Sequence, residues 1–207
     1  MYIPSAFRVD DLSAIHAALR DARLAQLVTA GPDGIVATPL PMLLETGEGG
    51  QGVLYGHMAR ANPQWKAPVN GDALAIFMGP DAYVSPSWYP GKQRDGKVVP
   101  TWNYLAIHVY GPVEYFDDAD RLRKVVTALT ARHEAGRPQP WAVSDAPADY
   151  IAAMLKGIVG VRLPIARIEA KRKMSQNRSE EDRAGVAAGL AASDDPLDRA
   201  AAALVPR

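Results

Sequence analysis

A strand-to-helix junction near residue 60 gathers the residues best suited to hold an anion. The segment 53–55 is apolar and suits a strand, whereas Asn62-Pro63 is a helix-start signal. His57 and Arg60 lie between these two signals. Helix N-termini offer free N–H groups and partial positive charge, and the arginine fork matches phosphate. The junction therefore predicts a phosphate site; the alternative is a surface arginine beside an ordinary strand histidine.

A second group of candidate residues is aromatic and lies in two loops, 85–90 and 99–104. Their aromatic side chains, with hydroxyl and amide side chains between them, are Trp88, Tyr89, Trp102 and Tyr104. Such residues present flat apolar faces and polar atoms, which would suit a planar heteroaromatic cofactor. They would equally suit a barrel core or a dimer interface, and the two interpretations are compatible. The polar segment 91–97 between the loops is predicted to be a loop tip.

One segment of the chain is strongly basic. Residues 169–178 carry four cationic side chains, Lys171, Arg172, Lys173 and Arg178. This cluster predicts contact with a phosphate group or with nucleic acid, and the alternative is a solvated face.

The composition limits the function classes. The chain has 207 residues, 23 basic and 23 acidic side chains and no cysteine. The absence of net charge gives no support to direct nucleic-acid binding, although a local patch could still provide it. Without cysteine, and with four scattered histidines, disulfides and a metal site are not expected. No apolar run is long enough to span a bilayer and no signal peptide is visible, so we expect a cytoplasmic protein.

The hydrophobic pattern predicts antiparallel strands with flanking helices. Helices are expected from Asp10 or Asp11 to about Leu24 and at 117–135, 144–156, 180–192 and 196–204. Strands are expected at 25–29 and 35–44 as a hairpin, from 53, at 73–78, at 82–85 after a break at Gly79-Pro80, along 105–116 and at 158–168. Two prolines, Pro39 and Pro41, place the strand 35–44 at a sheet edge or interrupt it. The pattern predicts an α+β domain on a barrel-like antiparallel sheet, over residues 1–178, with a helical tail at 179–207.

Several segments along the whole chain carry a resemblance to a known family. They are Met1-Tyr2-Ile3-Pro4, Gly56-His57 to Trp65, Ser85 to Pro90, Val99 to Tyr104, Thr130-Ala131-Arg132-His133-Glu134, Gln139-Pro140-Trp141 and Lys173-Met174-Ser175-Gln176-Asn177-Arg178. On these segments the chain resembles the PaiB family of FMN-binding negative transcriptional regulators. It departs from the family pattern at Pro39, where we expect a histidine, and at Arg172, where we expect an aromatic residue.

The resemblance implies a split β-barrel of the flavin reductase and pyridoxamine-phosphate oxidase type. It also implies a homodimer that binds FMN at the subunit interface. Arg60 and the backbone around Ala61 and Asn62 would hold the phosphate, with Lys173 as a second phosphate candidate. Thr38 and Pro39 would approach the isoalloxazine edge, and other residues, some from the partner subunit, would complete the pocket. The full expected cofactor-binding set is Thr38, Pro39, His57, Arg60, Ala61, Asn62, Trp102, Asn103, Lys173, Gln176 and Arg178.

Two functions are compatible with this resemblance. The family implies a negative regulator of transcription, although no helix-turn-helix pattern or basic recognition helix is visible, so repression could be indirect. The barrel type implies, by analogy, a flavin-dependent oxidoreductase acting on a small molecule, for which the sequence names no catalytic residue. A third hypothesis is a different ligand, such as haem.

Overall fold

The computed structural model describes residues 1–92 and 96–207, which form two compact units. Residues 93–95, in the predicted loop tip, lie outside the described part of the chain. Unit 1 consists of Met1–Ala18, Met78–Ile107 and Glu169–Arg207, and unit 2 consists of Leu19–Phe77 and His108–Ile168. Each unit is therefore assembled from segments far apart in the sequence. No helix in the described ranges is long and apolar enough to cross a membrane.

Unit 2 contains two antiparallel sheets. In the first, β2 (Ala25–Gly31) pairs with β3 (Gly34–Leu40) on one side and with the first residues of β6 (Ala73–Val84) on the other. The second sheet has the order β4 (Met42–Glu45), β5 (Val53–Ala59), β9 (Ile158–Pro164) and β8 (Glu114–Phe116). The predicted hairpin is confirmed. The predicted strand 35–44 is interrupted at Pro41 and contributes to both sheets, as its prolines indicated.

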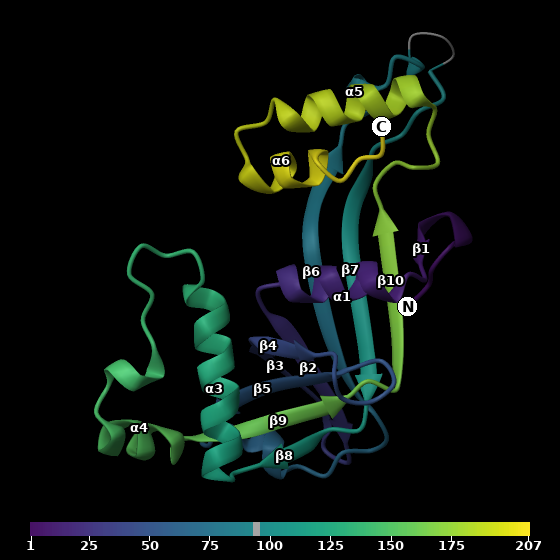
Figure 1. Cartoon of the computed structure of the whole chain (residues 1–207). Coiled ribbons are helices and arrows are strands. Elements are labelled where there is room, and N and C mark those ends of the chain that lie inside the picture. Colours follow the sequence, from purple (N-terminus) through teal and green to yellow (C-terminus); the bar gives the residue numbers. More distant parts are fainter. Residues whose placement is uncertain (93–95) are drawn as a thin grey trace. The chain divides into compact units, whose positions relative to one another are not determined.

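Two helices, α3 (Ala119–Glu134) and α4 (Ala148–Leu155), pack beside the second sheet of unit 2 (Figure 1). The buried side chains between them are Phe116, Leu122, Val125, Leu129, Val143, Ile151 and Leu155. Asp118 caps α3 by accepting a hydrogen bond of 2.8 Å from the backbone N–H of Arg121. The helix predicted from residue 144 begins later, because Pro147 occupies its N-cap; a short 3-10 turn, η4 (Val143–Asp145), precedes it.

Arg132, near the end of α3, gives a structural reason for the Thr130–Glu134 motif. Its guanidinium donates to the carbonyl oxygens of Met42 at 2.9 Å and Ala22 at 2.6 Å, and also to that of Arg20. Burial lowers the pKa of this side chain. A single arginine therefore ties α3 to β4 and to the C-terminal end of α1 (Leu12–Asp21), whose last carbonyls lack intrahelical partners.

Unit 1 contains a second group of strands and the C-terminal helices. Its strand order is β1 (Arg8–Val9), β10 (Arg167–Lys173), β7 (Thr101–Gly111) and β6. The helices α5 (Glu180–Ala191) and α6 (Pro196–Ala202) lie side by side (Figure 1). With the C-terminal end of β6 and the residue after the turn η3 (Pro86–Trp88), they bury a cluster: Ala82, Val84, Tyr89, Val186, Leu190, Ala201 and Val205. A further turn, η1 (Ser5–Phe7), precedes β1.

The helix starts follow the sequence closely. Asp11 accepts a hydrogen bond of 2.9 Å from the N–H of Ser13 at the start of α1, and Ser179 and Asp195 cap α5 and α6. These short-range caps are readable from sequence because donor and acceptor lie within three residues of each other. The end of α1 at Asp21 is three residues earlier than expected.

Three strand predictions are wrong. The expected break at Gly79-Pro80 is absent, since β6 runs through both residues; proline removes one donor but its φ is compatible with an extended chain. The expected long strand to Phe116 is two strands, β7 and β8, with Pro112 between them. The expected last strand, 158–168, is divided between β9, which ends at Pro164, and the first two residues of β10. The rest of β10 lies in the basic segment, where no strand was expected.

Candidate functional site

The predicted helix start at Asn62-Pro63 is confirmed. Pro63 begins the turn η2 (Pro63–Lys66), and the Asn62 side-chain oxygen accepts a hydrogen bond of 2.9 Å from the N–H of Gln64. The Asn62 amide nitrogen then donates to the Thr38 hydroxyl at 2.9 Å. The structure therefore brings together Thr38 and Asn62, two residues of the expected cofactor-binding set that are 24 positions apart.

Gln64 is a central polar residue of this corner, and the expected site did not include it. It is only 1% exposed. Its amide nitrogen donates to the carbonyl of Leu27 at 3.1 Å and to the hydroxyl of Thr29 at 3.0 Å, and its oxygen accepts from the Thr38 hydroxyl. These bonds join β2, β3 and η2 into a single rigid corner. No local sequence signal distinguishes this glutamine from an exposed one.

Strand β3 presents side chains to solvent beside this corner. It is the last strand in its sheet order, and Pro39 and Ala61 are exposed while Thr38 is half-buried. Ile35 is 77% exposed and Val36 is also exposed, although their side chains alternate between opposite faces of the strand. A strand edge with apolar residues exposed on both faces is a surface that a ligand or a second subunit can cover.

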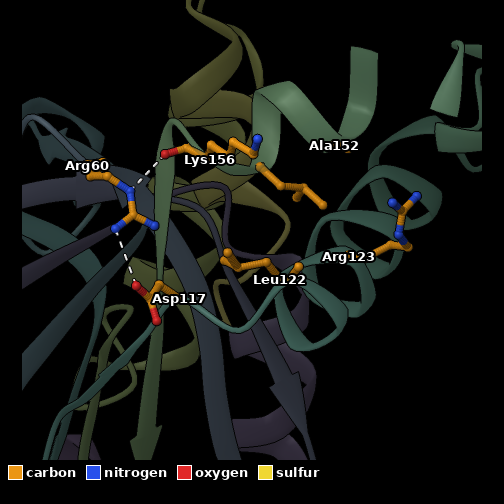
Figure 2. Close-up of a pocket in the computed structure, with 8 residues that line it drawn as sticks. Arg60, Asp117, Leu122, Arg123, Ala152 and Lys156 are labelled. Atoms are coloured by element: carbon orange, nitrogen blue, oxygen red, sulfur yellow. Dashed lines mark hydrogen bonds and ion pairs between the residues drawn. The ribbon is translucent and has the colours of Figure 1, made fainter. Parts of the chain in front are cut away.

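Arg60 contacts oxygens other than those of the Thr38–Asn62 corner (Figure 2). Its guanidinium donates to the carbonyls of Lys156 at 2.7 Å and Ile158 at 3.1 Å, and it lies 3.4 Å from the Asp117 carboxylate. Arg60 therefore holds the connection between α4 and β9. Its role toward a cofactor phosphate stays a prediction, and a phosphate there would share the guanidinium with these three oxygens.

His57 lies on β5, on the same side of the strand as Tyr55, two residues earlier. Tyr55 packs against the apolar cluster beneath α3, so His57 also belongs to the face that α3 covers. Its buried Nδ1 atom has no hydrogen-bond partner among the described residues, and burial lowers the pKa of the imidazole. The neutral form is therefore favoured at this position, and a role of His57 toward a cofactor stays a prediction.

Acidification should destabilise the protein through His57. The unfolded chain binds a proton near the ordinary pKa of 6.5, whereas the folded protein resists protonation because the pKa is lowered. The free energy of unfolding should therefore decrease as the pH falls below 6.5. Denaturant unfolding between pH 5 and pH 8, values that bracket the ordinary histidine pKa of about 6.5, measures this slope. His57→Leu should reduce the dependence of the free energy of unfolding on pH, whereas His133→Leu, at an exposed position, should not change it. The same pH dependence in the wild type and both variants would show that His57 is not its source.

Lys173, in unit 1, lies near two other cationic side chains. Its ammonium donates to the hydroxyl of Thr101 at 2.7 Å and to the carbonyl of Trp102, so both partners are neutral. Burial lowers the pKa of Lys173, and the neighbouring cations Lys171 and Arg178 lower it further. An anion placed here would relieve this repulsion; the contact of this segment with a phosphate group or with nucleic acid stays a prediction.

Asn103 carries an unused buried donor beside Lys173's partners Thr101 and Trp102 on β7. The residue is 0% exposed, and its side-chain oxygen accepts a hydrogen bond of 3.1 Å from the Ser175 hydroxyl. Its amide nitrogen has no partner among the described residues. Ser175 adopts a left-handed conformation with φ of 61°. A buried donor without a partner costs about 1–3 kcal/mol, so the site has a reason to accept an oxygen from a ligand.

The remaining predicted residues of unit 1 have different surroundings. Gln176 bonds backbone atoms, donating to Ala6 at 3.1 Å and accepting from Met174 at 2.6 Å, so it shapes the chain after β10. Arg178 lies over the Tyr89 ring at 4.9 Å. Trp102 is 54% exposed and is available to a ligand or a partner subunit.

The two aromatic loops have different surroundings, one buried and one partly exposed. Tyr89 is buried in the cluster with α5 and α6, and Trp88 packs against the same cluster. Trp102 has an edge-to-face contact with Tyr83, their centroids 6.0 Å apart, and both rings are largely exposed. The first loop therefore contributes to a buried hydrophobic cluster, whereas Trp102 has an exposed ring that a flat ligand could cover.

Comparison with known proteins identifies the family. The family model described as "Putative FMN-binding domain" matches residues 1–167. The protease synthase and sporulation protein PAI 2 of Bacillus subtilis is 33% identical, over 95% of this chain and 92% of its own length. The chain belongs to this FMN-binding family. The PaiB resemblance inferred from sequence motifs is thereby confirmed, and β10 and the C-terminal helices lie mostly beyond the matched region.

Several solved structures have a fold similar to that of this FMN-binding family member. A conserved hypothetical protein, Rv2991 of Mycobacterium tuberculosis, has a TM-score of 0.58 at 13% identity, over 87% of this chain and 95% of its own. The flavocytochrome Anf3 of Azotobacter vinelandii has a TM-score of 0.56 at 18% identity, over 86% of this chain and 75% of its own. The expected α+β fold with antiparallel sheets of the split-barrel type is confirmed.

Proposed function

We propose that this protein binds FMN and acts as a homodimer. The observation that carries the proposal is the buried Asn103 amide, whose nitrogen has no partner in residues 1–92 and 96–207. Asn103 lies on the same strand as Thr101 and Trp102, which hold Lys173. A cofactor with a phosphate and several polar ring atoms fits a site that combines a cation and an unused donor. The family match supports FMN as that cofactor.

Within this proposal the residues of unit 1 bind and orient the cofactor. Lys173 supplies positive charge, Asn103 supplies a directed donor, and Trp102 supplies an exposed flat ring. When bound, FMN supplies one- and two-electron redox chemistry. Gln176 holds the backbone before Arg178 in place, so it acts on the cofactor through the shape of the chain.

Unit 2 has a preorganised corner of its own. The Thr38–Asn62–Gln64 bonds fix the end of β3, so Pro39 lies on a backbone segment that is already held in place. Arg60 and Lys173 are the two candidates for the phosphate. One of the three oxygen partners of Arg60 is the Asp117 carboxylate, which already offsets part of its charge. The two partners of Lys173 are neutral, so its positive charge is the better candidate for a phosphate.

The homodimer is supported by exposed apolar residues in each unit. Unit 2 exposes Ile35 and Val36 on β3, and unit 1 exposes Met78, Tyr83 and Trp102. Aromatic residues and methionine are enriched at the cores of protein interfaces. A second copy of the chain that covers such surfaces is the assembly implied by the family resemblance.

For biological role, we propose a negative regulator of gene expression with FMN as its ligand. Support comes from the PaiB family and from the relative PAI 2, whose name refers to protease synthesis and sporulation. Salt-dependent binding to promoter DNA by the FMN-loaded protein would support direct regulation. FMN-dependent oxidation of NADH or NADPH, without DNA binding, would instead favour the alternative of a flavin-dependent oxidoreductase.

The flavin site is tested by titrating the protein with FMN and with riboflavin, which lacks the phosphate. We expect saturable quenching of FMN fluorescence and weaker binding of riboflavin. Lys173→Gln should reduce FMN affinity about tenfold and remove the preference over riboflavin, because one charged hydrogen bond contributes about 1.5–3 kcal/mol. Asn103→Ala should weaken both ligands.

The same titration with Arg60→Ala separates the two phosphate candidates. If Arg60 mainly holds the α4–β9 connection, this variant loses thermal stability but keeps its preference for FMN over riboflavin. Loss of the preference in Arg60→Ala alone would move the phosphate to Arg60. Failure of the wild-type protein to bind FMN at saturating concentration would contradict the proposed cofactor.

A further inference from the structure

A pocket in unit 2 lies between the N-terminal part of α3 and the C-terminal part of α4 (Figure 2). Its volume is about 430 Å³. The pocket is lined by two buried leucines, Leu122 and Leu155, and by Ala119 and Ala152. Its charged lining residues are Arg60, Asp117, Arg123 and Lys156. The pocket thus combines an apolar surface with a strongly polar rim, which is typical of sites for small amphiphilic ligands.

The charges of the rim are unbalanced. Three cations face one carboxylate, which leaves an excess of two positive charges. The carboxylate, Asp117, lies 3.4 Å from Arg60, so the nearest cation already offsets part of its charge. No side-chain ion pair or hydrogen bond engages the charged ends of Arg123 and Lys156 within residues 1–92 and 96–207; the backbone carbonyl of Lys156 is what Arg60 binds.

The arrangement of these side chains leaves room for a ligand. Arg60 and Arg123 lie at opposite sides of the pocket, and the Lys156 side chain extends between them (Figure 2). Arg60 is held by its bonds to the Lys156 and Ile158 carbonyls. Arg123 and Lys156 are exposed, and their long, flexible stems can bring both charged groups to one anion above the leucines.

We propose that this pocket binds a small phosphomonoester that carries an apolar group, at a site separate from the proposed FMN site. A phosphomonoester has a charge of about −1.5 to −2 at neutral pH, which matches the excess of positive charge better than a single carboxylate does. Its phosphate contacts Arg123 and Lys156, and its apolar group covers Leu122 and Leu155. The proposal goes beyond FMN binding and uses neither Asn103 nor Lys173.

Phenyl phosphate is a suitable probe because it has both required parts. Isothermal titration of the full-length, FMN-loaded protein should give saturable binding of phenyl phosphate. Inorganic phosphate, which lacks the apolar part, and phenol, which lacks the charge, should each bind at least about tenfold more weakly. Equal affinities for phenyl phosphate and inorganic phosphate would overturn the proposed apolar contact. Benzoate binding as tightly as phenyl phosphate would overturn the assignment to a phosphomonoester.

Four single variants locate the site. Arg123→Gln and Lys156→Gln should each weaken phenyl phosphate binding about tenfold, because each removes a charged hydrogen bond. Lys124→Gln removes the same charge from the next residue of α3, outside the pocket lining, and should leave the affinity within about twofold. Asp117→Asn removes the only carboxylate of the rim and should strengthen binding about threefold. This gain of affinity cannot result from misfolding.

The FMN titration distinguishes this site from the proposed cofactor site. FMN affinity should be unchanged in Arg123→Gln and in Lys156→Gln, and excess FMN should not displace phenyl phosphate. Displacement by FMN, together with weakened FMN binding in both variants, would overturn the separate site and assign the pocket to the flavin phosphate. Absence of phenyl phosphate binding in a protein that binds FMN would refute the pocket proposal alone.

Discussion

Gln64→Leu should lower the free energy of unfolding by about 3 kcal/mol. The substitution keeps the volume of the side chain but removes every bond by which Gln64 joins β2, β3 and η2. The hydroxyls of two threonines and the carbonyls of Leu27 and Val36 then have fewer partners, and each unsatisfied buried group costs about 1–3 kcal/mol. Urea unfolding followed by circular dichroism measures the change.

Gln139→Leu is the matched control, because Gln139 is exposed. Its free energy of unfolding should differ from that of the wild type by less than about 0.5 kcal/mol. The Gln64 variant should also bind FMN more weakly, since the end of β3 loses its fixed position. Equal stability of Gln64→Leu and Gln139→Leu would contradict the central role of this side chain.

Gly185→Ala should destabilise the packing of α5, although alanine is the better helix former. The intrinsic gain is about 1 kcal/mol for a glycine in a helix interior. Against this, a Cβ atom at Gly185 would come closer than 3.0 Å to the carbonyl oxygen of Trp88. That oxygen belongs to the backbone of η3, so it cannot rotate away, and overpacking of this kind costs about 3 kcal/mol. The net loss should be about 2 kcal/mol.

Thermal unfolding and limited proteolysis together test this prediction. The loss should appear as a lower melting temperature and as faster cleavage within α5 and α6. Gly50→Ala is the control, since a Cβ atom there meets nothing within 4 Å and the residue lies in a loop. A Gly185→Ala protein more stable than the wild type would show that helix propensity outweighs the contact with Trp88.

The parts of the fold that the sequence predicts well depend on short-range chemistry. Asn62, Asp118 and Asp195 cap their helices through acceptors that lie two or three residues from the donors. Pro41, which has no backbone N–H to donate, separates β3 from β4, and both strands lie at sheet edges. Strand β10 was missed because its charges hide the alternation; Lys171 is buried there, with its ammonium bonded to the Tyr2 carbonyl at 3.3 Å.

The site itself was only partly predictable, for a related physical reason. The family resemblance implies that both Thr38 and Asn62 belong to the cofactor pocket, but it does not indicate the hydrogen bond between them. The partners of Arg60, at Asp117, Lys156 and Ile158, lie 57 to 98 positions later in the chain, and no local pattern indicates them. Burial of Gln64 and the unused donor of Asn103 likewise depend on which strands pack together.

The most direct test of the central claim is native mass spectrometry of the full-length protein with excess FMN. One chain has a mass of 22.3 kDa. We expect a species of two chains that carries one FMN per chain, and a Lys173→Gln protein that remains a dimer but loses FMN at lower collision energy. A protein that stays monomeric, or a dimer that never retains FMN, would contradict this expectation.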